Sequence, residues 1–233
     1  CYGIEAINNL GNPAALIGHS LGEYTALCLS GYLDYKDALK VIAVRGEEMH
    51  KAVENSNTTM AAVLTGDLET TIEEIEKLNN QGIQIWISNF NDPSQIVISS
   101  YIDDMNYLKS NPKALSAKRV IPLEVAGAFH TEIVSSAKKP LEDTLNSIDI
   151  SEGKIPVYMN VDAKKVEVST LKESLVNQID NSVLFNQQIE FVNNDIDPDL
   201  WCHIGPGNVT AGMVRKSISY RDLKVINSLE SSK

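Results

Sequence analysis

The sequence contains few cysteines, few aromatic residues and a deficit of positive charge. Its 233 residues include three cysteines, Cys1, Cys28 and Cys202, with no CxxC pair, and 6% aromatic residues. An odd number of widely spaced cysteines excludes a disulfide framework and a cysteine-rich metal site, and it favours a reducing compartment. No apolar run approaches the roughly 20 residues that a membrane-spanning helix requires. The net charge of −11 argues against a nucleic-acid-binding surface and against binding to an anionic membrane.

The remaining composition is that of an ordinary globular protein. Hydrophobic residues make up 43% of the chain and charged residues 22%, and this length suits one large domain with a smaller domain inserted. The chain begins with Cys1 and not with Met, so we expect that the natural N-terminus lies upstream and that a targeting segment would not be visible. We expect a cytoplasmic protein, with the mitochondrial matrix as the alternative.

Helices and strands are predicted to alternate along the first 125 residues. A buried strand over 14–18 precedes a helix over 21–29 that ends at Gly31, and Asp34 is the predicted N-cap of a helix that reaches Val53. Strands are predicted over 59–65, 83–88, 95–99 and 118–125, helices over 67–79 and 101–109, and a turn over 89–94. The order β-α-β-β-α-β is that of a ferredoxin-like unit.

The alternation continues after residue 125. We expect a helix over 131–148, a strand over 155–159, a helix from an N-cap at Ser169 to residue 179, a strand over 200–204, a helix over 209–217 and a strand over 223–226. This order predicts an α/β fold with a mostly parallel sheet covered on both faces. Residues 1–57 and 126–233 would form the larger domain, and residues 58–125 the inserted subdomain.

The segment Gly18-His19-Ser20-Leu21-Gly22 has the GxSxG pattern of a nucleophile elbow between a strand and a helix. Such a turn holds the serine in a strained conformation at the helix N-terminus, and small flanking residues let the chain pass close beneath it. The N–H of Leu21 is then the natural donor to an oxyanion. The pattern alone is weak evidence, but this context predicts a nucleophilic Ser20.

A serine nucleophile needs a general base, and four histidines are available. His130 is the best candidate, because it lies among small residues between a predicted strand and a predicted helix. His19 is adjacent to Ser20, but neighbouring side chains at a tight turn diverge. We interpret His50 as part of a solvated helix face and His203 as a core histidine.

Several motifs together make the sequence similar to the malonyl-CoA:acyl-carrier-protein transacylase family, the acyltransferases of fatty-acid and polyketide synthesis. The resemblance covers essentially the whole chain. It rests on GHSLGEY at 18–24, RG at 45–46 with Met49, MAAV at 60–63, NFN at 89–91, GAFH at 127–130, NVDA at 160–163 and IGPG at 204–207. It implies an α/β-hydrolase-like domain with a ferredoxin-like insertion, which agrees with the predicted order of elements.

The resemblance also implies roles for individual residues. It makes Ser20 the nucleophile, His130 its general base and Arg45 the residue that holds the malonyl carboxylate. The main-chain carbonyl of Gln178 would orient His130, which requires no carboxylate and explains why no triad aspartate is obvious. Leu21 would supply one oxyanion N–H.

Asn89 and Asn91 correspond to cleft asparagines of the family near the subdomain boundary. The family's Gly-Gln-Gly segment, which supplies a glutamine to the oxyanion hole, has no counterpart in this sequence. We therefore expect a fragment that lacks one sheet strand and one oxyanion donor. Loss of such a donor typically lowers the rate by about 10²–10³-fold.

The side chains of Arg45 and Phe129 bear on specificity. A planar guanidinium can hold a carboxylate through two parallel hydrogen bonds, and an arginine near an apolar helix face is costly without an anionic partner. An internal salt bridge of Arg45 to Glu47, to Glu48 or to an acid elsewhere in the chain is the alternative. We expect Phe129 to narrow the pocket at the malonyl α-carbon and to disfavour methylmalonyl groups.

The resulting hypothesis is a ping-pong transfer of malonyl from malonyl-CoA to the phosphopantetheine thiol of acyl carrier protein in fatty-acid biosynthesis, by a monomer without metal or cofactor. Alternatives are a serine hydrolase or thioesterase on the same elbow, a trans-acting acyltransferase of polyketide synthesis, and a non-enzymatic module that binds acyl carrier protein. Because carrier proteins are acidic, a basic docking patch is expected. One candidate cluster, which could equally be a solvated face, is Lys109, Lys113, Lys118 and Arg119.

Overall fold

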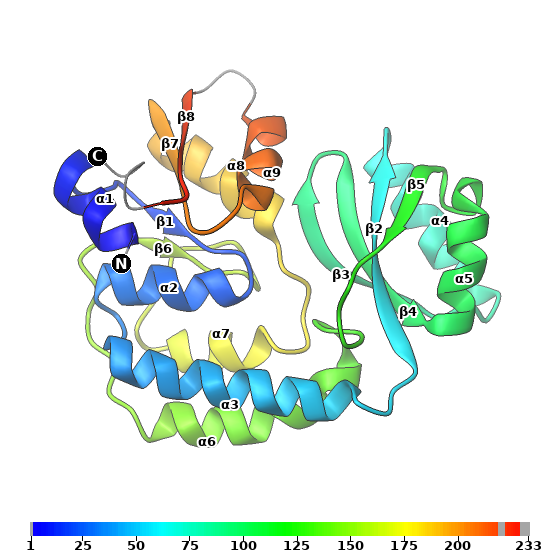
Figure 1. Ribbon diagram of the computed structural model, residues 1–233, viewed down its shortest axis with the longest axis horizontal. Coiled ribbons are helices and arrows are strands. Elements are labelled where there is room, and N and C mark those ends of the chain that lie inside the picture. Colours follow the sequence, from blue (N-terminus) through cyan, green and yellow to red (C-terminus); the bar gives the residue numbers. More distant parts are fainter. Residues whose placement is uncertain (1, 219–221, 229–233) are drawn as a thin grey trace.

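The computed structural model describes residues 2–218 and 222–228, so Cys1 lies outside the described residues. Figure 1 shows two parts side by side, one containing helices α1, α2, α3 and α6 to α9 and the other formed by an antiparallel sheet with its helices. Three clusters of buried hydrophobic side chains form the core, and one of them lies entirely within the antiparallel part. No helix in the described ranges is long and apolar enough to cross a membrane.

After an N-terminal helix, the chain forms a short strand and two helices, as predicted. Strand β1 (Leu16–Ile17) leads into α2 (Leu21–Ser30), and α3 (Tyr35–Val53) follows. Gly31 ends α2 in the left-handed conformation, with φ 87°, which glycine adopts without steric cost. Asp34 caps α3 by accepting a hydrogen bond from the N–H of Lys36 at 2.8 Å. Helix α1 (Tyr2–Leu10) was not predicted.

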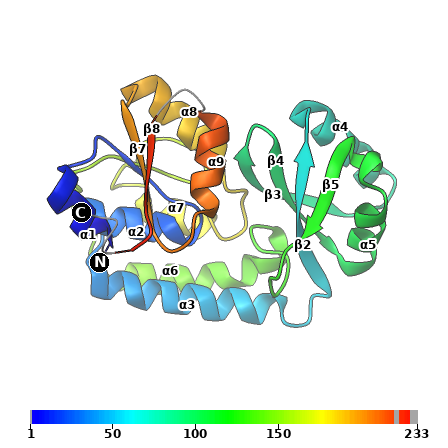
Figure 2. The same cartoon turned by 45° about the horizontal axis from the view of Figure 1, so that its top comes forward.

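The antiparallel part has the predicted β-α-β-β-α-β order. Its strands are β2 (Thr58–Thr65), β3 (Ile85–Asp92), β4 (Gln95–Tyr101) and β5 (Ala117–Pro122), in the sheet order β3-β4-β2-β5. Helices α4 (Leu68–Asn80) and α5 (Ile102–Ser110) cover the sheet, as the turned view in Figure 2 also shows. A 3-10 turn, η1 (Pro112–Leu115), precedes β5.

The predicted turn over 89–94 is wrong for its first four residues. Strand β3 continues to Asp92, and the chain reverses only at Pro93 and Ser94. The polar residues Asn89, Asn91 and Asp92 suggested a turn, yet all three are buried. Their burial reflects a neighbour that the local sequence does not reveal, the segment around residue 183.

That neighbour joins the two parts of the molecule. The N–H of Phe90 donates to the carbonyl of Val183, and the N–H of Val183 donates to the carbonyl of Ser88, at 2.8 and 2.9 Å. Lys216 adds an ion pair of 3.0 Å to the buried carboxylate of Asp92. Strand β3 is therefore held against the segment that carries Gln178 a few residues earlier.

The last third of the chain differs most from the prediction. Its elements are η2 (Glu132–Ala137), α6 (Lys138–Asn146), β6 (Val157–Tyr158), α7 (Leu171–Asn177), α8 (Phe185–Ile196), β7 (Leu200–Ile204), α9 (Val209–Ser217) and β8 (Asp222–Ile226). The region predicted as one helix over 131–148 begins as a 3-10 turn. Thr170, and not Ser169, occupies the N-cap position of α7. Helix α8 was missed, because its buried face mixes apolar residues with Asn186 and Gln188.

The strands outside the antiparallel sheet pair in parallel, as predicted. Strand β1 pairs with β6, and β7 pairs with β8. In the described residues they form two separate two-stranded sheets. Helices α3 and α6 run side by side along one edge of this part in both views (Figures 1 and 2).

Candidate active site

Ser20 occupies a strained turn between β1 and α2. Its backbone angles are φ 51° and ψ −106°, a conformation that a residue with a side chain rarely adopts. A Cβ atom on Gly18 would lie 2.1 Å from the carbonyl carbon of Gly22, so only glycine fits at position 18. A Cβ atom on Gly22 would meet nothing within 4 Å. The expected need for a small residue therefore applies to position 18. At position 22 it is the backbone that approaches Gly18, and a side chain would have room.

The structure brings Ser20 and His130 together. Oγ of Ser20 lies 2.8 Å from Nε2 of His130, and Nδ1 of His130 lies 2.8 Å from the main-chain carbonyl of Gln178. Because a carbonyl only accepts, Nδ1 carries the proton, and Nε2 is free to accept the hydroxyl proton of Ser20. Burial, with a contribution from the charge of Arg45, lowers the pKa of His130 to about 3. The imidazole is therefore neutral at physiological pH, as a general base must be.

Arg45 points at the nucleophile from α3. Its Nη2 donates to Oγ of Ser20 at 2.9 Å and to Oε1 of Gln178 at 3.0 Å, and its side chain crosses the ring of Tyr24 with 5.6 Å between Cζ and the ring centroid. The residue is 7% exposed, and its Nε is buried without a hydrogen-bond partner in the described part of the chain. The guanidinium thus keeps donor capacity beside Ser20 for an anionic ligand.

The alternative assignment for Arg45, a salt bridge to Glu47 or Glu48, is wrong. Both glutamates pair instead with Lys51, at 2.7 and 2.8 Å. Within the described ranges no carboxylate forms an ion pair with Arg45. The reason is geometric, because Arg45 lies on the buried face of α3 whereas Glu47 and Lys51 lie on the solvent face.

Asn160 braces the elbow from the loop after β6. Its side chain accepts the N–H of Ser20 at 2.8 Å and donates to the carbonyl of Gly18 at 2.6 Å. The side-chain amide of Gln178 donates to the carbonyl of Ser20 at 3.0 Å. The sequence analysis assigned no role to Asn160 and only a main-chain role to Gln178. Their side chains compensate the backbone groups that the strained turn cannot pair within a helix or a sheet.

Glu23 completes this buried network in the first turn of α2. It is fully buried, and its two carboxylate oxygens accept hydrogen bonds from the N–H of Asn160 and from the side chain of Gln178. Burial raises the pKa of Glu23 to about 8, although these donors and the charge of Arg45 act in the opposite direction. Glu23 had no predicted role, although it belongs to the GHSLGEY motif and is a charged residue on a face of α2 that is otherwise apolar.

The two cleft asparagines lie in β3. Asn91 is 2% exposed, and its Oδ1 lies 2.9 Å from Nε2 of His19, whose ring also meets Phe185 edge-on at 5.2 Å. Asn89 is buried beside Val183. The side chain of His19 therefore makes a structural contact with Asn91 and does not turn toward Ser20 as a base. This contact ties β3 to the residue before the nucleophile.

Leu21 and Phe129 lie beside the two predicted catalytic residues. Leu21 is the first residue of α2, where an N–H has no partner within the helix, and its side chain is 52% exposed. Phe129 is half-buried and packs against the core cluster that includes α3 residues. These positions are compatible with an oxyanion donor and with a pocket wall, respectively.

The other candidates lie away from this cluster. His50 is exposed, as expected, and His203 is only half-buried, with Nδ1 2.8 Å from Oγ1 of Thr210. All four residues of the basic cluster at 109–119 are exposed. Over residues 2–218 and 222–228, no group of three or more His, Cys, Asp or Glu side chains could hold a metal ion.

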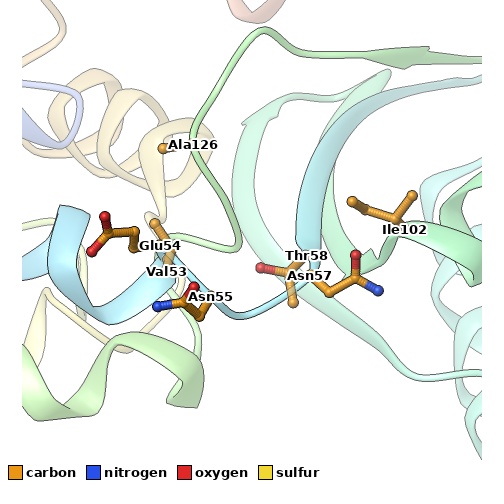
Figure 3. Close-up of a pocket in the computed structure, with 7 residues that line it drawn as sticks. All are labelled: Val53, Glu54, Asn55, Asn57, Thr58, Ile102 and Ala126. Atoms are coloured by element: carbon orange, nitrogen blue, oxygen red, sulfur yellow. The ribbon is translucent and has the colours of Figure 1, made fainter.

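Two cavities adjoin this region without including Ser20 or Arg45 among their lining residues. The cavity in Figure 3, about 400 Å³, lies where α3 ends and β2 begins, and contains none of the predicted site residues. The second, about 460 Å³, is lined by His130 and Asp180 together with Trp86 of β3.

Comparisons with known proteins agree with this arrangement. The family model described as "Acyl transferase domain" matches residues 4–229. The malonyl CoA-acyl carrier protein transacylase of Bacillus subtilis (strain 168) is 37% identical over 205 residues, which cover 88% of this chain and 64% of the relative. The enzyme of that name from Staphylococcus aureus (strain MRSA252) is 34% identical over 233 residues, 99% of this chain and 74% of the relative.

Solved structures show the same similarity. The malonyl CoA-acyl carrier protein transacylase of Clostridium perfringens is 32% identical, with a TM-score of 0.88 over 98% of this chain and 72% of that chain. A structure described as a type II PKS acyl-carrier protein in complex with its malonyl-transacylase is 28% identical, with a TM-score of 0.89 over 99% of this chain and 76% of that chain. The motif residues, the fold and these matches agree: the chain belongs to the acyl transferase domain family, among the malonyl CoA-acyl carrier protein transacylases.

Proposed function

We propose that this protein transfers a malonyl group from malonyl-CoA to the phosphopantetheine thiol of acyl carrier protein, as a step of fatty-acid biosynthesis. One observation carries the proposal: Oγ of Ser20 forms hydrogen bonds both with the neutral base His130 and with the cationic Arg45. A base activates the hydroxyl for acyl transfer, and the cation selects an acyl group that ends in a carboxylate.

The first half-reaction acylates the serine. Nε2 of His130 takes the Oγ proton as Oγ attacks the thioester carbonyl carbon, and the N–H of Leu21 donates to the oxyanion of the tetrahedral intermediate. Collapse breaks the C–S bond, and the proton on His130 passes to the leaving CoA sulfur. A malonyl ester of Ser20 remains, with its free carboxylate against the guanidinium of Arg45.

The second half-reaction reverses these steps with a different thiol. His130 takes the proton of the phosphopantetheine thiol, the sulfur attacks the ester carbonyl, and the C–O bond to Ser20 breaks as His130 returns the proton to Oγ. The protein carries both steps with its own side chains. We expect no metal and no cofactor.

Partner and pathway are part of the same proposal. The structure of a similar malonyl-transacylase in complex with an acyl-carrier protein supports a carrier protein as the acceptor. The exposed basic cluster at 109–119 offers complementary charge to an acidic carrier, and a solvated face is its alternative. A monomeric state and a cytoplasmic location remain predictions.

We infer further that residues 58–125 form a ferredoxin-like subdomain, and residues 1–57 with 126–233 the catalytic domain. The antiparallel sheet and its helices have their own buried cluster, which includes Ile96, Ile98 and Leu108. Besides the two connecting segments, strand β3 links it to the rest through residues 182–184, through the ion pair of Asp92 with Lys216 and through the contact of Asn91 with His19.

The discriminating test is Arg45→Ala in the full-length protein, compared with acylation of the wild type by malonyl-CoA and by acetyl-CoA. This variant loses the proposed hydrogen bonds between the guanidinium and the malonyl carboxylate. We therefore expect malonyl loading to fall by about 10²-fold or more, while acetyl loading falls far less. Intact-mass measurement of the acyl-enzyme gives both rates. Lys40→Ala, an exposed substitution on the same helix, should leave both unchanged.

Other outcomes point to the alternatives. Equal losses on both substrates would favour a serine hydrolase or thioesterase that acts on neutral acyl groups. Absence of any acyl adduct on the wild type, with binding of acyl carrier protein retained, would favour a non-enzymatic module.

A further inference from the structure

Glu23 is a buried carboxyl group that the acyl-transfer steps do not use. Its exposed fraction is 0%, and its carboxylate turns inward from the first turn of α2, three residues after Ser20. Its Oε1 accepts the main-chain N–H of Asn160, and its Oε2 accepts the side-chain amide of Gln178. Both contacts are hydrogen-bond donors, so the arrangement suits the carboxylate and leaves no acceptor for an added proton.

A buried carboxyl group at this position lowers the stability of the folded protein if packing is its only role. In the described part of the chain, Glu23 forms no ion pair with a lysine or an arginine, and burial opposes its ionisation. A buried charge without a directly paired cation is normally replaced by a neutral group, because an isosteric neutral or apolar residue is often as stable or more stable. The position therefore calls for a role beyond packing α2.

The role becomes visible in the side chain of Gln178. Its Oε1 accepts from Arg45, and its Nε2 donates to Glu23 and to the carbonyl of Ser20. An amide has two ends of opposite polarity, and here the oxygen faces the cation of Arg45 while the nitrogen faces the acceptor oxygens of Glu23 and of the Ser20 carbonyl. These partners select one of the two amide orientations, and only in this orientation does Gln178 offer Arg45 an acceptor.

We propose that Glu23 is a positioning residue for recognition of the acyl carboxylate: it orients the amide of Gln178, and that amide holds the guanidinium of Arg45 beside Ser20. This inference rests on the proposed malonyl transfer and extends it by one residue that touches neither substrate nor nucleophile side chain. Recognition of the negative charge then depends on a buried carboxyl group on the far side of an amide.

The variant Glu23→Gln tests the relay, because it replaces one acceptor oxygen by a donor while keeping the size. The nitrogen of the new amide is a donor. It would face another donor, either the N–H of Asn160 or the side-chain amide of Gln178. Rotation of Gln178 relieves the second conflict, but it turns a donor toward Arg45. We therefore expect the KM for malonyl-CoA to rise about tenfold or more, and the KM for acetyl-CoA to change less than threefold, in the full-length protein.

A merely structural role predicts a different result. A less stable α2 lowers the fraction of active enzyme, so kcat falls equally for both substrates and neither KM changes. The matched control Ala26→Gly loosens the same helix at a buried position outside the network and should show that pattern, with a lower melting temperature. If Glu23→Gln behaves as this control does, the proposal is wrong.

A second variant and a wild-type control complete the test. If Glu23→Gln does not fold, Gln178→Met removes the relaying amide but retains the carbonyl that orients His130. It should show the selective rise in malonyl KM, and a parallel loss on both substrates would overturn the proposal. If the wild type itself forms no malonyl ester, the proposed function fails before any variant is compared, whereas a wild type that loads malonyl isolates the role of Glu23.

Discussion

Oγ of Ser20 lies 2.8 Å from Nε2 of His130, and both residues have positive φ angles, 51° and 59°. Neither is glycine, so each end of this hydrogen bond sits in a sparsely populated backbone conformation. The hydrogen bond spans 110 positions of the chain. Strain at both ends persists because the surroundings fix each turn, with Asn160 against Ser20 and the carbonyl of Gln178 against His130.

The pair should act as one catalytic unit. We predict that Ser20→Ala abolishes the covalent acyl adduct, and that His130→Ala lowers the rate of adduct formation by about 10³-fold or more, because the hydroxyl loses its proton acceptor. Steady-state transfer rates of the two single variants and the double variant provide the measurement. The double variant should be no slower than Ser20→Ala, and multiplicative losses would contradict a shared step.

The pH dependence should reflect the low pKa of His130. The ordinary histidine pKa is 6.5, and burial lowers that of His130 to about 3. The base therefore stays neutral on acidification, and we expect the acylation rate of Ser20 to be nearly constant from about pH 7.5 down to about pH 5. Pre-steady-state adduct formation across this range is the measurement. A fall with a midpoint near 6.5 would show an imidazole that titrates normally.

The same pKa shift has a consequence for stability. Between about pH 6.5 and pH 3 the unfolded chain binds a proton at His130 that the folded chain excludes, so this residue's contribution to stability falls as the pH falls through that window. Denaturant unfolding at several pH values should show a smaller acid destabilisation in His130→Phe than in the wild type. Equal acid sensitivity of the two proteins would argue against the shift.

The glycines of the elbow should respond differently to the same substitution. Gly18→Ala places a Cβ atom 2.1 Å from backbone of Gly22, so we predict a loss of about 1–3 kcal/mol in the free energy of unfolding and a large loss of acylation. Gly22→Ala meets open space within a helix and should be neutral or stabilising by up to about 1 kcal/mol. Chemical denaturation measures both. Similar destabilisation by the two variants would contradict the observed close approach.

Phe129 is expected to restrict the acyl group at its α-carbon. We predict that Phe129→Ser raises the ratio of methylmalonyl to malonyl loading by about tenfold, because a methyl group then has room beside the reacting carbon. Competition between the two CoA esters, followed by mass measurement of the acyl-enzyme, gives the ratio directly. An unchanged ratio would show that another residue sets the preference.

Local patterns were sufficient for the elements whose signals lie within a few residues. Asp34 and Val53 bound α3 as predicted, and Gly31 ends α2, because caps and apolar periodicity are properties of neighbouring residues. The elbow was equally readable, since a strand, GxSxG and a helix follow one another directly. Prediction failed at α8 and at the end of β3, where buried polar residues are paired by partners far away in the chain.

The sequence by itself determined the α/β class and the order of most elements, because residue type and short-range spacing specify these, and its resemblance to a known family named Ser20, His130 and Arg45 as the candidates for the chemistry. Only the tertiary structure decided how they are held. It placed Asn160 against the strained turn and Gln178 between Arg45 and Glu23. Glu23 and Gln178 are 155 positions apart in the chain. Such contacts depend on how β3, β6 and α7 converge on the turn, and no local pattern records the distance between segments that meet only on folding.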